Sequence, residues 1–325
     1  MATFGATKPK TAIKSLNKTT IQQPTYTEWH DLQVNAINRF PLHTNFFTYP
    51  ADDWVYEKDG KIVSKDILHM NKTESKYFLS LDGTWKFNWV ANADQRPTDF
   101  YKEDLDDSKW KTMNLPGIWE MNGFGDPEYV NVGFGWRGHF DQQPPAVPTK
   151  DNHVGSYRRI IDIPANWDGK QVVAHFGSVT SNIYLYVNGK FAGYAEDSKV
   201  AAEFDITPYL KKGKNLIAFQ TFRWCDGSWD EDQDFWRLSG VARESYLFAR
   251  DAQLHLEDIR VTPDLVNNYK DGVLNISAKV KGNGKLNFIL FDKEGKQVAI
   301  ATGLAKNGTA NITMNVENPH KWNAE

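Results

Sequence analysis

The sequence predicts an all-β protein in which a jelly-roll β-sandwich is followed by an incomplete immunoglobulin-like β-sandwich. Three observations support this fold class. Aromatic residues, which suit strands, make up 14% of the 325 residues. Apolar and polar residues alternate in many short stretches that are separated by turn signals. Helical periodicity is almost absent, and this combination is typical of sandwiches and jelly rolls.

The jelly roll is predicted over residues 76–250. Its pattern begins with KYFLSLDGTWKFNWV, where alternation runs from Phe78 to Val90 and Asp82-Gly83 gives a turn signal. The stretches NLIAFQTFRW and RESYLFARDA predict two further strands near its end.

The clearest hairpin is SNIYLYVNGKFAGYA. Alternation predicts that Ile183, Leu185 and Val187 face one side of a sheet, with Tyr184 and Tyr186 on the other side. The Asn-Gly pair between the two strands supplies the residues that tolerate the positive φ angles of a type I′ turn.

Two segments precede the jelly roll. Residues 1–27 are polar and without period, so we expect a disordered or surface-draped arm. Residues 28–75 carry scattered apolar residues but no long periodic stretch. We therefore expect an ordered, irregular segment that is laid on another part of the protein.

Residues 251–325 are predicted to form the immunoglobulin-like sandwich, after a boundary near residues 250–254. Its alternating stretches are separated by Asp, Asn, Gly and Lys. We count four to five strands, whereas such a domain needs about seven. Because an unpaired core edge promotes aggregation, we expect that the sequence is truncated or that a partner supplies the missing strands.

Composition and motifs exclude several classes of function. The net charge of −3 gives no electrostatic case for nucleic acid, and the apolar runs are far shorter than the ~20 residues that span a bilayer. No zinc, serine-hydrolase or phosphate-binding motif appears. The single cysteine, Cys225, excludes an intrachain disulfide. The absence of an apolar signal core predicts a cytoplasmic location, or a periplasmic one if a signal was removed earlier.

An acidic run over residues 226–234 invites a metal interpretation. Asp230, Asp232 and Asp234 copy the start of a calcium loop. However, Phe235 stands where that loop requires Gly, and Val241 stands where it requires Glu, so an EF-hand is rejected.

The hypothesis that we favour is that some of these acids pair with Arg223, Arg237 and Arg243 in a folded loop, because buried charges need partners. Asp232 and Asp234, which tryptophans flank, are our candidates for holding the loop against a neighbouring domain.

Two stretches resemble glycoside hydrolase family 2. NLPGIWEMNGFGDPEYVNVGFGW resembles the family segment P-x-x-W-x-x-x-G, an aromatic, then Y-x-N-V. The stretch from GYAEDS to RESYL contains R-W-x-D-G-S and E-D-Q-D-x-W-R-x-S-G, with rare tryptophans at fixed places. With EWHDLQVNAINRFPLHTNFF and ENPHKWNAE, the resemblance runs from about residue 28 to the last residue, and it points to the large β-galactosidases.

This resemblance implies a galactose-binding-like jelly roll in an enzyme that hydrolyses terminal β-D-galactosides, such as lactose, with retention. In the family two glutamates, only ~5–5.5 Å apart, perform the reaction on a (β/α)₈ barrel after the immunoglobulin-like domain. A barrel needs about 250 residues, and no alternating βα pattern is present. We therefore expect no catalytic residue in this chain and no activity from the chain alone.

Two residues match substrate-contacting positions of the family. Asn131 matches an asparagine beside the bound galactose. Asp197 matches an aspartate that contacts the galactose 6-hydroxyl and helps to ligate sodium, and the complete enzyme also uses magnesium. From the residues alone, each is more often a turn or cap residue.

Three hypotheses follow. The chain is part of a β-galactosidase, completed by a barrel in the same chain or in a partner subunit and homo-oligomeric when complete. Alternatively, it is a stand-alone carbohydrate-binding module, because flat rings stack on pyranoses, although the same aromatics suit an all-β core. The third hypothesis is a degraded gene product. The unclosed second sandwich argues against the stand-alone module.

Overall fold

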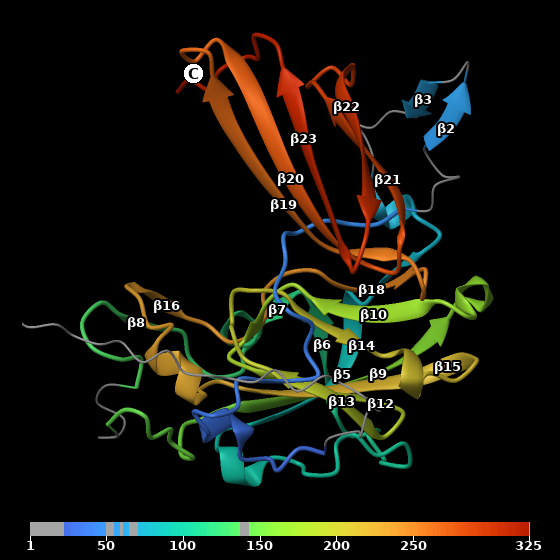
Figure 1. Ribbon diagram of the computed structural model, residues 1–325. Coiled ribbons are helices and arrows are strands. Elements are labelled where there is room, and N and C mark those ends of the chain that lie inside the picture. The colour runs from blue at the N-terminus through green and yellow to red at the C-terminus, as the bar shows by residue number, and fades with distance from the viewer. Residues whose placement is uncertain (1–22, 50–54, 59–60, 65–70, 137–142, 325) are drawn as a thin grey trace, which may run out of the picture.

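The computed structural model describes residues 23–49, 55–58, 61–64, 71–136 and 143–324 and is built almost entirely of strands (Figure 1). The all-β prediction is confirmed. The helices among these residues are short 3-10 turns: η1 (Glu28–His30), η3 (Lys72–Glu74), η4 (Ala93–Gln95), η5 (Glu120–Asn122), η6 (Ala165–Trp167), η7 (Thr207–Tyr209) and η8 (Asp226–Trp229). None of these described helices has the length and apolar character needed to cross a membrane.

The first sandwich is formed by two facing antiparallel sheets. The larger has the order β1 (Ala36–Ile37), β13 (Lys190–Ala195), β12 (Ile183–Val187), β15 (Gly213–Phe222), β9 (Val154–Ile163), β5 (Gly83–Val90) and β6 (Lys111–Leu115). The smaller has the order β14 (Ala202–Asp205), β10 (Gln171–Phe176), β18 (Ser245–Arg250) and β4 (Phe78–Ser80).

Three small sheets lie outside the two large sheets of this sandwich. They are β11 (Val179–Thr180) with β17 (Gly240–Val241) and β7 (Gly117–Ile118), β16 (Phe235–Arg237) with β8 (Glu128–Val130), and β2 (Val55–Lys58) with β3 (Lys61–Ser64). The pair β8–β16 extends sideways from the sandwich (Figure 1).

Aromatic rings fill the core between the two large sheets. Phe219 is fully buried, with its ring centroid 4.3 Å from that of Tyr157, 5.3 Å from that of Trp85 and 5.3 Å from that of Phe176. Such rings bury ~150–250 Å² each, so a few of them account for much of the hydrophobic stabilisation. The high aromatic content therefore serves this core first.

The alternation predicted for β12 is confirmed. Its aliphatic residues lie in the core between the sheets, and Tyr184 and Tyr186 lie on the opposite face of the larger sheet. The turn to β13 is confirmed as well, because Asn188 and Gly189 have φ angles of 50° and 75°.

Residues 23–37 cover the tyrosine face of the larger sheet, and Phe40 and Phe47 pack on the smaller sheet. Trp29 is 4% exposed and stacks on Phe222, with 5.0 Å between ring centroids. β1 extends the sheet by pairing Ile37 with Tyr194 of β13. A sheet face that a sandwich normally leaves to solvent is thus buried by the N-terminal segment.

The arm predicted over residues 1–27 is described only from residue 23 onwards, and residues 1–22 lie outside the described residues. In the described part, Tyr26 stacks on Tyr184 with 5.8 Å between ring centroids. This end of the arm therefore lies on the sandwich.

The Asp82-Gly83 turn connects the two sheets and does not close a hairpin. β4 pairs with β18, whereas β5 pairs with β6 and β9. Gly83 has a φ angle of 106°, a conformation that glycine adopts readily, and the chain crosses the core there.

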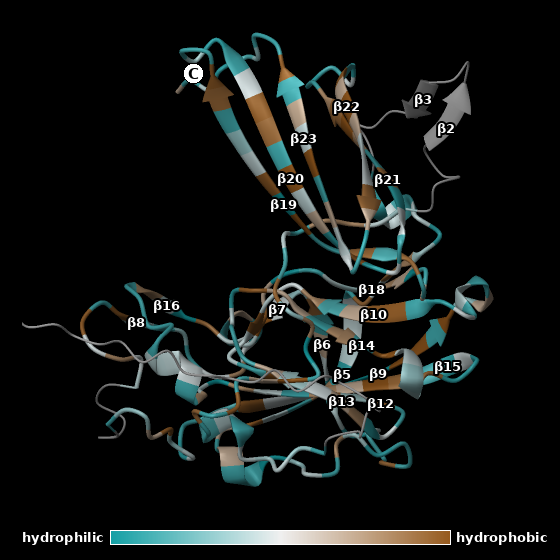
Figure 2. Cartoon of the chain, in the orientation of Figure 1, coloured by the Kyte–Doolittle hydropathy of each residue, from teal (hydrophilic) through white to brown (hydrophobic). Residues whose placement is uncertain are grey.

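The second sandwich begins at His255, after β18 has ended at Arg250. Its strands form one sheet of β19 (His255–Val266), β20 (Asp271–Lys281) and β23 (Thr309–Val316) and a second of β21 (Gly284–Phe291) and β22 (Gln297–Ala305). In Figure 2, much of β10 is hydrophobic, whereas β20 and β23 change repeatedly between hydrophobic and hydrophilic. β10 is buried along its whole length, while β20 and β23 each have one solvated face.

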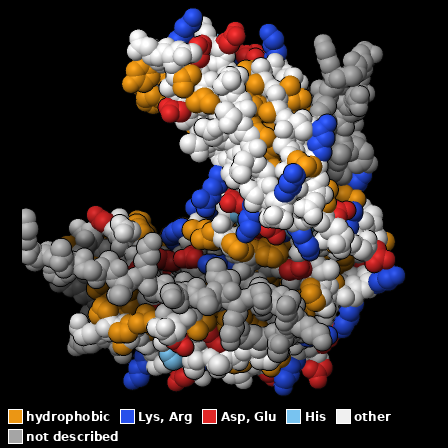
Figure 3. All heavy atoms as spheres, in the orientation of Figure 1, with side chains coloured by type: hydrophobic (Ala, Val, Ile, Leu, Met, Phe, Trp, Pro, Cys, Tyr) orange, Lys and Arg blue, Asp and Glu red, His pale blue; other side chains and the backbone are white. Residues whose placement is uncertain are grey.

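The second sandwich lies above β10 and β18 of the first (Figure 1), and the surface is hollowed between the two on one side (Figure 3). The N-terminal segment contacts both. Thr44 donates its hydroxyl to the carbonyl of Ile259 at 2.8 Å, and its amide lies 3.2 Å from the carboxylate of Asp258, both on β19.

Candidate functional site

The acidic loop over residues 226–234 leads from β15 to β16 and is held by its own acids. Asp232 lies 2.5 Å from Arg237, and both side chains are largely buried. Glu231 accepts a hydrogen bond from the amide of Ser198 at 2.9 Å. A buried acid next to a guanidinium is well compensated, so the loop has a fixed conformation.

The predicted pairing of loop acids with arginines is confirmed for Arg237. The other two arginines bind elsewhere: Arg223 lies 3.0 Å from Glu128 on β8, and Arg243 donates to the carbonyl of Lys199 at 2.7 Å. The structure thus distributes these charges over three neighbouring elements.

Asp234 was expected to hold the loop against a neighbouring domain, together with Asp232. Within the described residues it instead accepts a hydrogen bond from the hydroxyl of Tyr129 at 2.7 Å. The reason is the pairing of β8 with β16, which places Tyr129 opposite Trp236 and next to Asp234. Both acids therefore fix the loop to its own sandwich.

Asn131 follows the last residue of β8 and is exposed. Val130 pairs with Phe235 in the antiparallel β8–β16 ribbon. The same register continued by one residue places Asn131 opposite Asp234. Asn131 and Asp234, both exposed, are thus the residues that adjoin the last pair of this ribbon.

Asp197 follows β13 at a different place, beside the edge strand β1. Its Oδ2 lies 2.5 Å from Nη1 of Arg39, and its side chain is 42% exposed. Its φ angle of 79° is left-handed, a conformation that Asp and Asn tolerate better than most residues. Neither sequence-predicted residue contacts the other through a described bond.

The pairing of β8 with β16 therefore places Asn131 and Asp234 next to the paired residues Val130 and Phe235, and sequence reasoning proposed only a structural role for Asp234. The sequence did contain a signal for a role of Asp234, because Asp234 ends the E-D-Q-D string that stands just before β16. What the sequence could not give was the partner strand, which comes from residues more than 100 positions earlier.

A second acidic group is buried behind the loop. Ligand atoms of Glu196, Cys225 and Asp226 all lie within 4.8 Å of one another, and all three residues are buried. Burial raises the pKa of Glu196 to about 8 and also raises the pKa of Asp226. Two carboxyl groups this close share a proton or require a cation, because both cannot stay ionised in a buried site otherwise.

Residues 78–251 match the family described as "Glycosyl hydrolases family 2, sugar binding domain". The chain belongs to glycosyl hydrolase family 2. Residues 254–325 match a second model of this family, "Glycosyl hydrolases family 2". The first match covers the jelly roll, and the second covers the strands after it.

Family 2 relatives similar to the chain are β-galactosidases. That of Priestia megaterium (strain DSM 319 / IMG 1521) is 35% identical over 313 residues, which span 92% of this chain and 29% of the relative. That of Lactobacillus delbrueckii subsp. bulgaricus is 36% identical, over 91% of this chain and 28% of the relative. The β-galactosidase large subunit of Leuconostoc lactis is 32% identical, over 91% of this chain and 46% of that subunit. The chain thus spans less than a third of the length of the first two.

Solved structures of the family have the same fold. A β-glucuronidase of Bifidobacterium dentium superposes with a TM-score of 0.60 at 18% identity, over 78% of this chain and 44% of that one. A β-glucuronidase 2 of Bacteroides uniformis superposes with a TM-score of 0.58 at 20% identity, over 75% of this chain and 28% of that one. At this identity the likeness shows the fold alone.

Proposed function

We propose that the chain is the N-terminal portion of a β-galactosidase that hydrolyses terminal β-D-galactosides, such as lactose, with retention. The observation that carries the proposal is the match to β-galactosidases over 92% of this chain but only 29% of the relative's length. The remaining length of such a relative has room for a barrel of about 250 residues. In this proposal that barrel supplies the two glutamates, from the same chain or from a partner subunit, and the complete enzyme is a homo-oligomer.

The jelly roll in this proposal contributes binding groups to the edge of the barrel's active site. The exposed amide of Asn131 can both donate to and accept from sugar hydroxyls. Asp197 is the carboxylate that the family pattern nominates for the galactose 6-hydroxyl. Asp234 competes for that role, because the ribbon register supports its placement opposite Asn131.

A sodium ion at Asp197 would have to share the carboxylate with Arg39. Sodium prefers oxygen ligands, and a guanidinium 2.5 Å from Oδ2 leaves only the second oxygen for a cation. Asp234 has no such cation beside it among its described bonds, since its partner is the Tyr129 hydroxyl. The geometry therefore favours Asp234 over Asp197 as the carboxylate for sodium.

In this proposal the buried pair of acids, Glu196 and Asp226, is the magnesium site of the chain. Glu196 and Asp226 offer the carboxylate oxygens that hard cations prefer, and an ion between them would replace the proton in the hydrogen bond that joins the two carboxyls. The Cys225 thiol is a poor ligand for magnesium and would stay outside its coordination sphere. In this role magnesium neutralises the buried acid pair and stabilises the loop.

The first test uses the purified chain with nitrophenyl β-galactoside and with galactose. We expect no hydrolysis and weak or no binding by calorimetry. Hydrolysis at an enzymatic rate would overturn the location of the catalytic groups. Micromolar galactoside affinity without hydrolysis would instead support the stand-alone binding module.

The second test compares Asp197→Asn, Asp234→Asn and Asn131→Ala in the complete enzyme. Loss of a substrate-facing carboxylate should raise KM at least about tenfold, since a hydrogen bond to a charged group contributes about 1.5–3 kcal/mol. Loss of the neutral Asn131 amide should raise KM less, since a neutral hydrogen bond contributes about 0.5–1.5 kcal/mol. Asp168→Asn, at an exposed residue of the opposite end, is the matched control. An unchanged KM and sodium response in Asp197→Asn would remove that residue from the site.

A further inference from the structure

The N-terminal segment crosses the molecule as a strap with contacts at both ends. We call residues 36–44 the strap. At its start, β1 pairs with β13 and Arg39 binds Asp197. At its end, Thr44 binds β19 of the second sandwich. A contact that fixes the strap therefore affects two places at once. One is Asp197, a proposed substrate residue, and the other is the contact of Thr44 with the second sandwich.

The middle of the strap lies along β14. Phe40 donates its amide to the carbonyl of Glu203 at 2.9 Å, and Arg39 forms a β-bridge with Phe204. The side chain of Glu203 then turns toward the strap and accepts a hydrogen bond from Nε2 of His43 at 2.9 Å. One residue of β14 thus holds the strap through both its backbone and its carboxylate.

Both ring nitrogens of His43 face groups that can only accept hydrogen bonds. Nε2 lies 2.9 Å from the Glu203 carboxylate, and Nδ1 lies 2.7 Å from the carbonyl oxygen of Thr44. A neutral imidazole has one donor and one lone pair, so it would direct a lone pair at one of these oxygens. The geometry therefore fits an imidazolium, which donates from both nitrogens.

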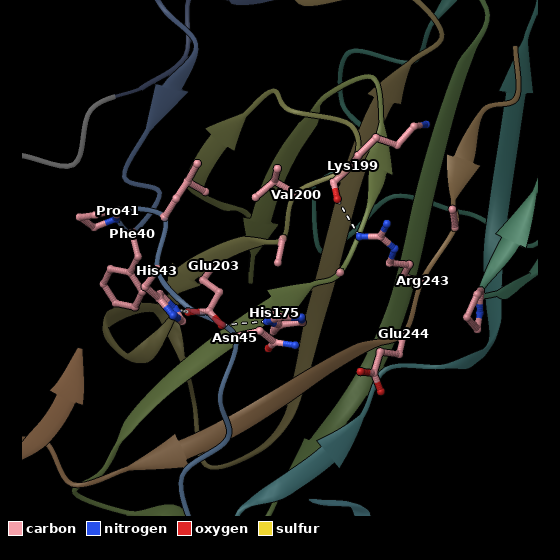
Figure 4. Close-up of a pocket in the computed structure, with 15 residues that line it drawn as sticks. Phe40, Pro41, His43, Asn45, His175, Lys199, Val200, Glu203, Arg243 and Glu244 are labelled. Atoms are coloured by element: carbon pink, nitrogen blue, oxygen red, sulfur yellow. Dashed lines mark hydrogen bonds and ion pairs between the residues drawn. The ribbon is translucent and has the colours of Figure 1, made fainter. Parts of the chain in front are cut away.

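A second histidine completes the arrangement on the other carboxylate oxygen. Nδ1 of His175 on β10 lies 2.8 Å from Oε1 of Glu203, and its ring stacks on Tyr246 at 4.3 Å between centroids. Figure 4 shows His43, Glu203 and His175 side by side at the wall of a cavity of about 600 Å³. The stack holds His175 in place, so Glu203 stays directed at the strap.

Three strands next to His43, namely β14, β18 and β19, each carry a charged residue near it. Glu203 on β14 and Asp258 on β19 are negative and favour the imidazolium. Arg250 on β18 interacts with Glu203 and lies over the ring of Phe40 at 5.4 Å, so it competes for the same carboxylate. The hydrogen bond to Glu203 raises the pKa of His43 above its usual range, although burial opposes this.

Burial alone would raise the pKa of Glu203, but the hydrogen bonds from the two histidines outweigh burial and lower it to about 2. Glu203 therefore stays ionised throughout the range in which His43 titrates. The remaining charged residues that line the cavity, Lys199, Arg243 and Glu244, are exposed and screened by solvent.

We propose that the strap is a pH-sensitive clasp, closed when His43 carries its proton and loosened when that proton is lost. Loss of the proton removes one of two donors and the charge opposite Glu203, and charge-assisted hydrogen bonds are about twice as strong as neutral ones. The sign follows from linkage: the contribution of His43 is complete below about pH 6.5 and is lost as the pH rises through its raised folded-state pKa. The clasp itself does not depend on the proposed function, and only its effect on galactoside binding through Asp197 does.

The test is hydrogen exchange of the full chain, followed by mass spectrometry and corrected for intrinsic chemical rates. Peptides that cover residues 36–44 should exchange about fivefold faster at pH 8.5 than at pH 6 in the wild-type chain. His43→Gln, which keeps one donor but has no charge, should exchange fast at both pH values. His43→Lys, which stays charged at both, should remain protected. His320→Gln, at an exposed histidine of the second sandwich, should match the wild type.

Equal wild-type protection of the strap at both pH values would overturn the clasp. Peptides from β10 report whether a variant has lost its fold, because that strand is buried along its length. As a measurement that needs no variant, the His43 ring should titrate above pH 6.5 by NMR, and titration at or below that value would also overturn the proposal. Galactoside binding is not part of either readout, so failure of the clasp and failure of the proposed function are separate results.

Discussion

Nη1 of Arg39 lies 2.5 Å from Oδ2 of Asp197, which joins the N-terminal strap to the loop after β13. The side chain of Arg39 is 12% exposed and that of Asp197 is 42% exposed, so water reaches the pair from the side of Asp197. A pair in this setting contributes modestly, because solvent screens it.

A double-mutant cycle of Arg39→Gln and Asp197→Asn should give a coupling energy of about 0.5–1 kcal/mol. Asn is the suitable replacement because it also tolerates the left-handed backbone at this position. Urea unfolding at low salt and in 1 M NaCl measures the coupling, which should shrink in salt. A coupling above about 3 kcal/mol would mean that the pair is far better shielded than its exposure indicates.

The glycine at position 193 permits close contact between strands β13 and β14. A Cβ there would lie 2.4 Å from Cδ1 of Phe204 and 2.7 Å from the carbonyl oxygen of Ile37. Gly193→Ala should therefore destabilise the fold by about 1–3 kcal/mol, because neither neighbour is a flexible side-chain end. Thermal unfolding measures the loss. In the same experiment, Gly284→Ala should leave the free energy of unfolding nearly unchanged, because the nearest atom to a Cβ there is 3.6 Å away.

The ring of Phe219 is at the centre of the jelly-roll core. Its truncation in Phe219→Ala removes contacts with three aromatic rings and should cost about 3–5 kcal/mol. Trp322→Ala removes a larger side chain that is 89% exposed, and its effect should stay within about 0.5 kcal/mol. A similar loss in the free energy of unfolding of both variants would contradict the placement of Phe219 in the core.

The buried His153 should act opposite to His43 in the pH dependence of stability. Burial, and then the charge of Arg223, lower the pKa of His153 to about 4. The unfolded chain therefore binds a proton that the folded chain does not, so stability should fall as the pH drops from about 6.5 toward 4, by at most about 1.4 kcal/mol per pH unit. His153→Asn should flatten this part of the curve in urea unfolding. A wild-type curve that is already flat between pH 4 and 6.5 would exclude the buried neutral histidine.

Addition of magnesium tests the buried acid pair. If Glu196 and Asp226 hold the ion, 10 mM MgCl₂ at pH 8 should raise the melting temperature of the chain, by the mass-action effect of a ligand that binds only the folded state. Glu196→Gln should abolish the rise, while Glu294→Gln, at an exposed acid of the second sandwich, should leave it intact. An equal rise in both variants would indicate a general salt effect.

Local sequence patterns were sufficient for the strands and for several turns. Alternation placed Tyr184 and Tyr186 on one face of β12, and the Asn-Gly pair gave the turn to β13. These predictions succeed because the period of a strand and the φ preferences of turn residues depend only on neighbours in the chain. The rare tryptophan-containing motifs were sufficient for the family, which the matches over residues 78–251 and 254–325 then showed.

Local sequence patterns could not predict which charged residues pair with each other. The sequence suggested that loop acids pair with arginines, which is true of Asp232 with Arg237 but not of Arg223, whose partner Glu128 lies on another strand. Asp234 binds the hydroxyl of Tyr129 on β8, a partner that the sequence did not indicate, and its contact with a neighbouring domain stays a prediction. The roles of Asn131 and Asp197 toward a galactoside stay predictions.

The sequence by itself therefore determined the strands, their faces, the turn chemistry and the family, since each depends on residues that are close in the chain or on long motifs. Only the tertiary structure decided that Arg39 meets Asp197, that His43 meets Glu203 and that Val130, just before Asn131, pairs with Phe235, just after Asp234. The physical reason is that these pairs are more than 100 residues apart, so they meet only after the order of strands in each sheet has been fixed by the packing of the core.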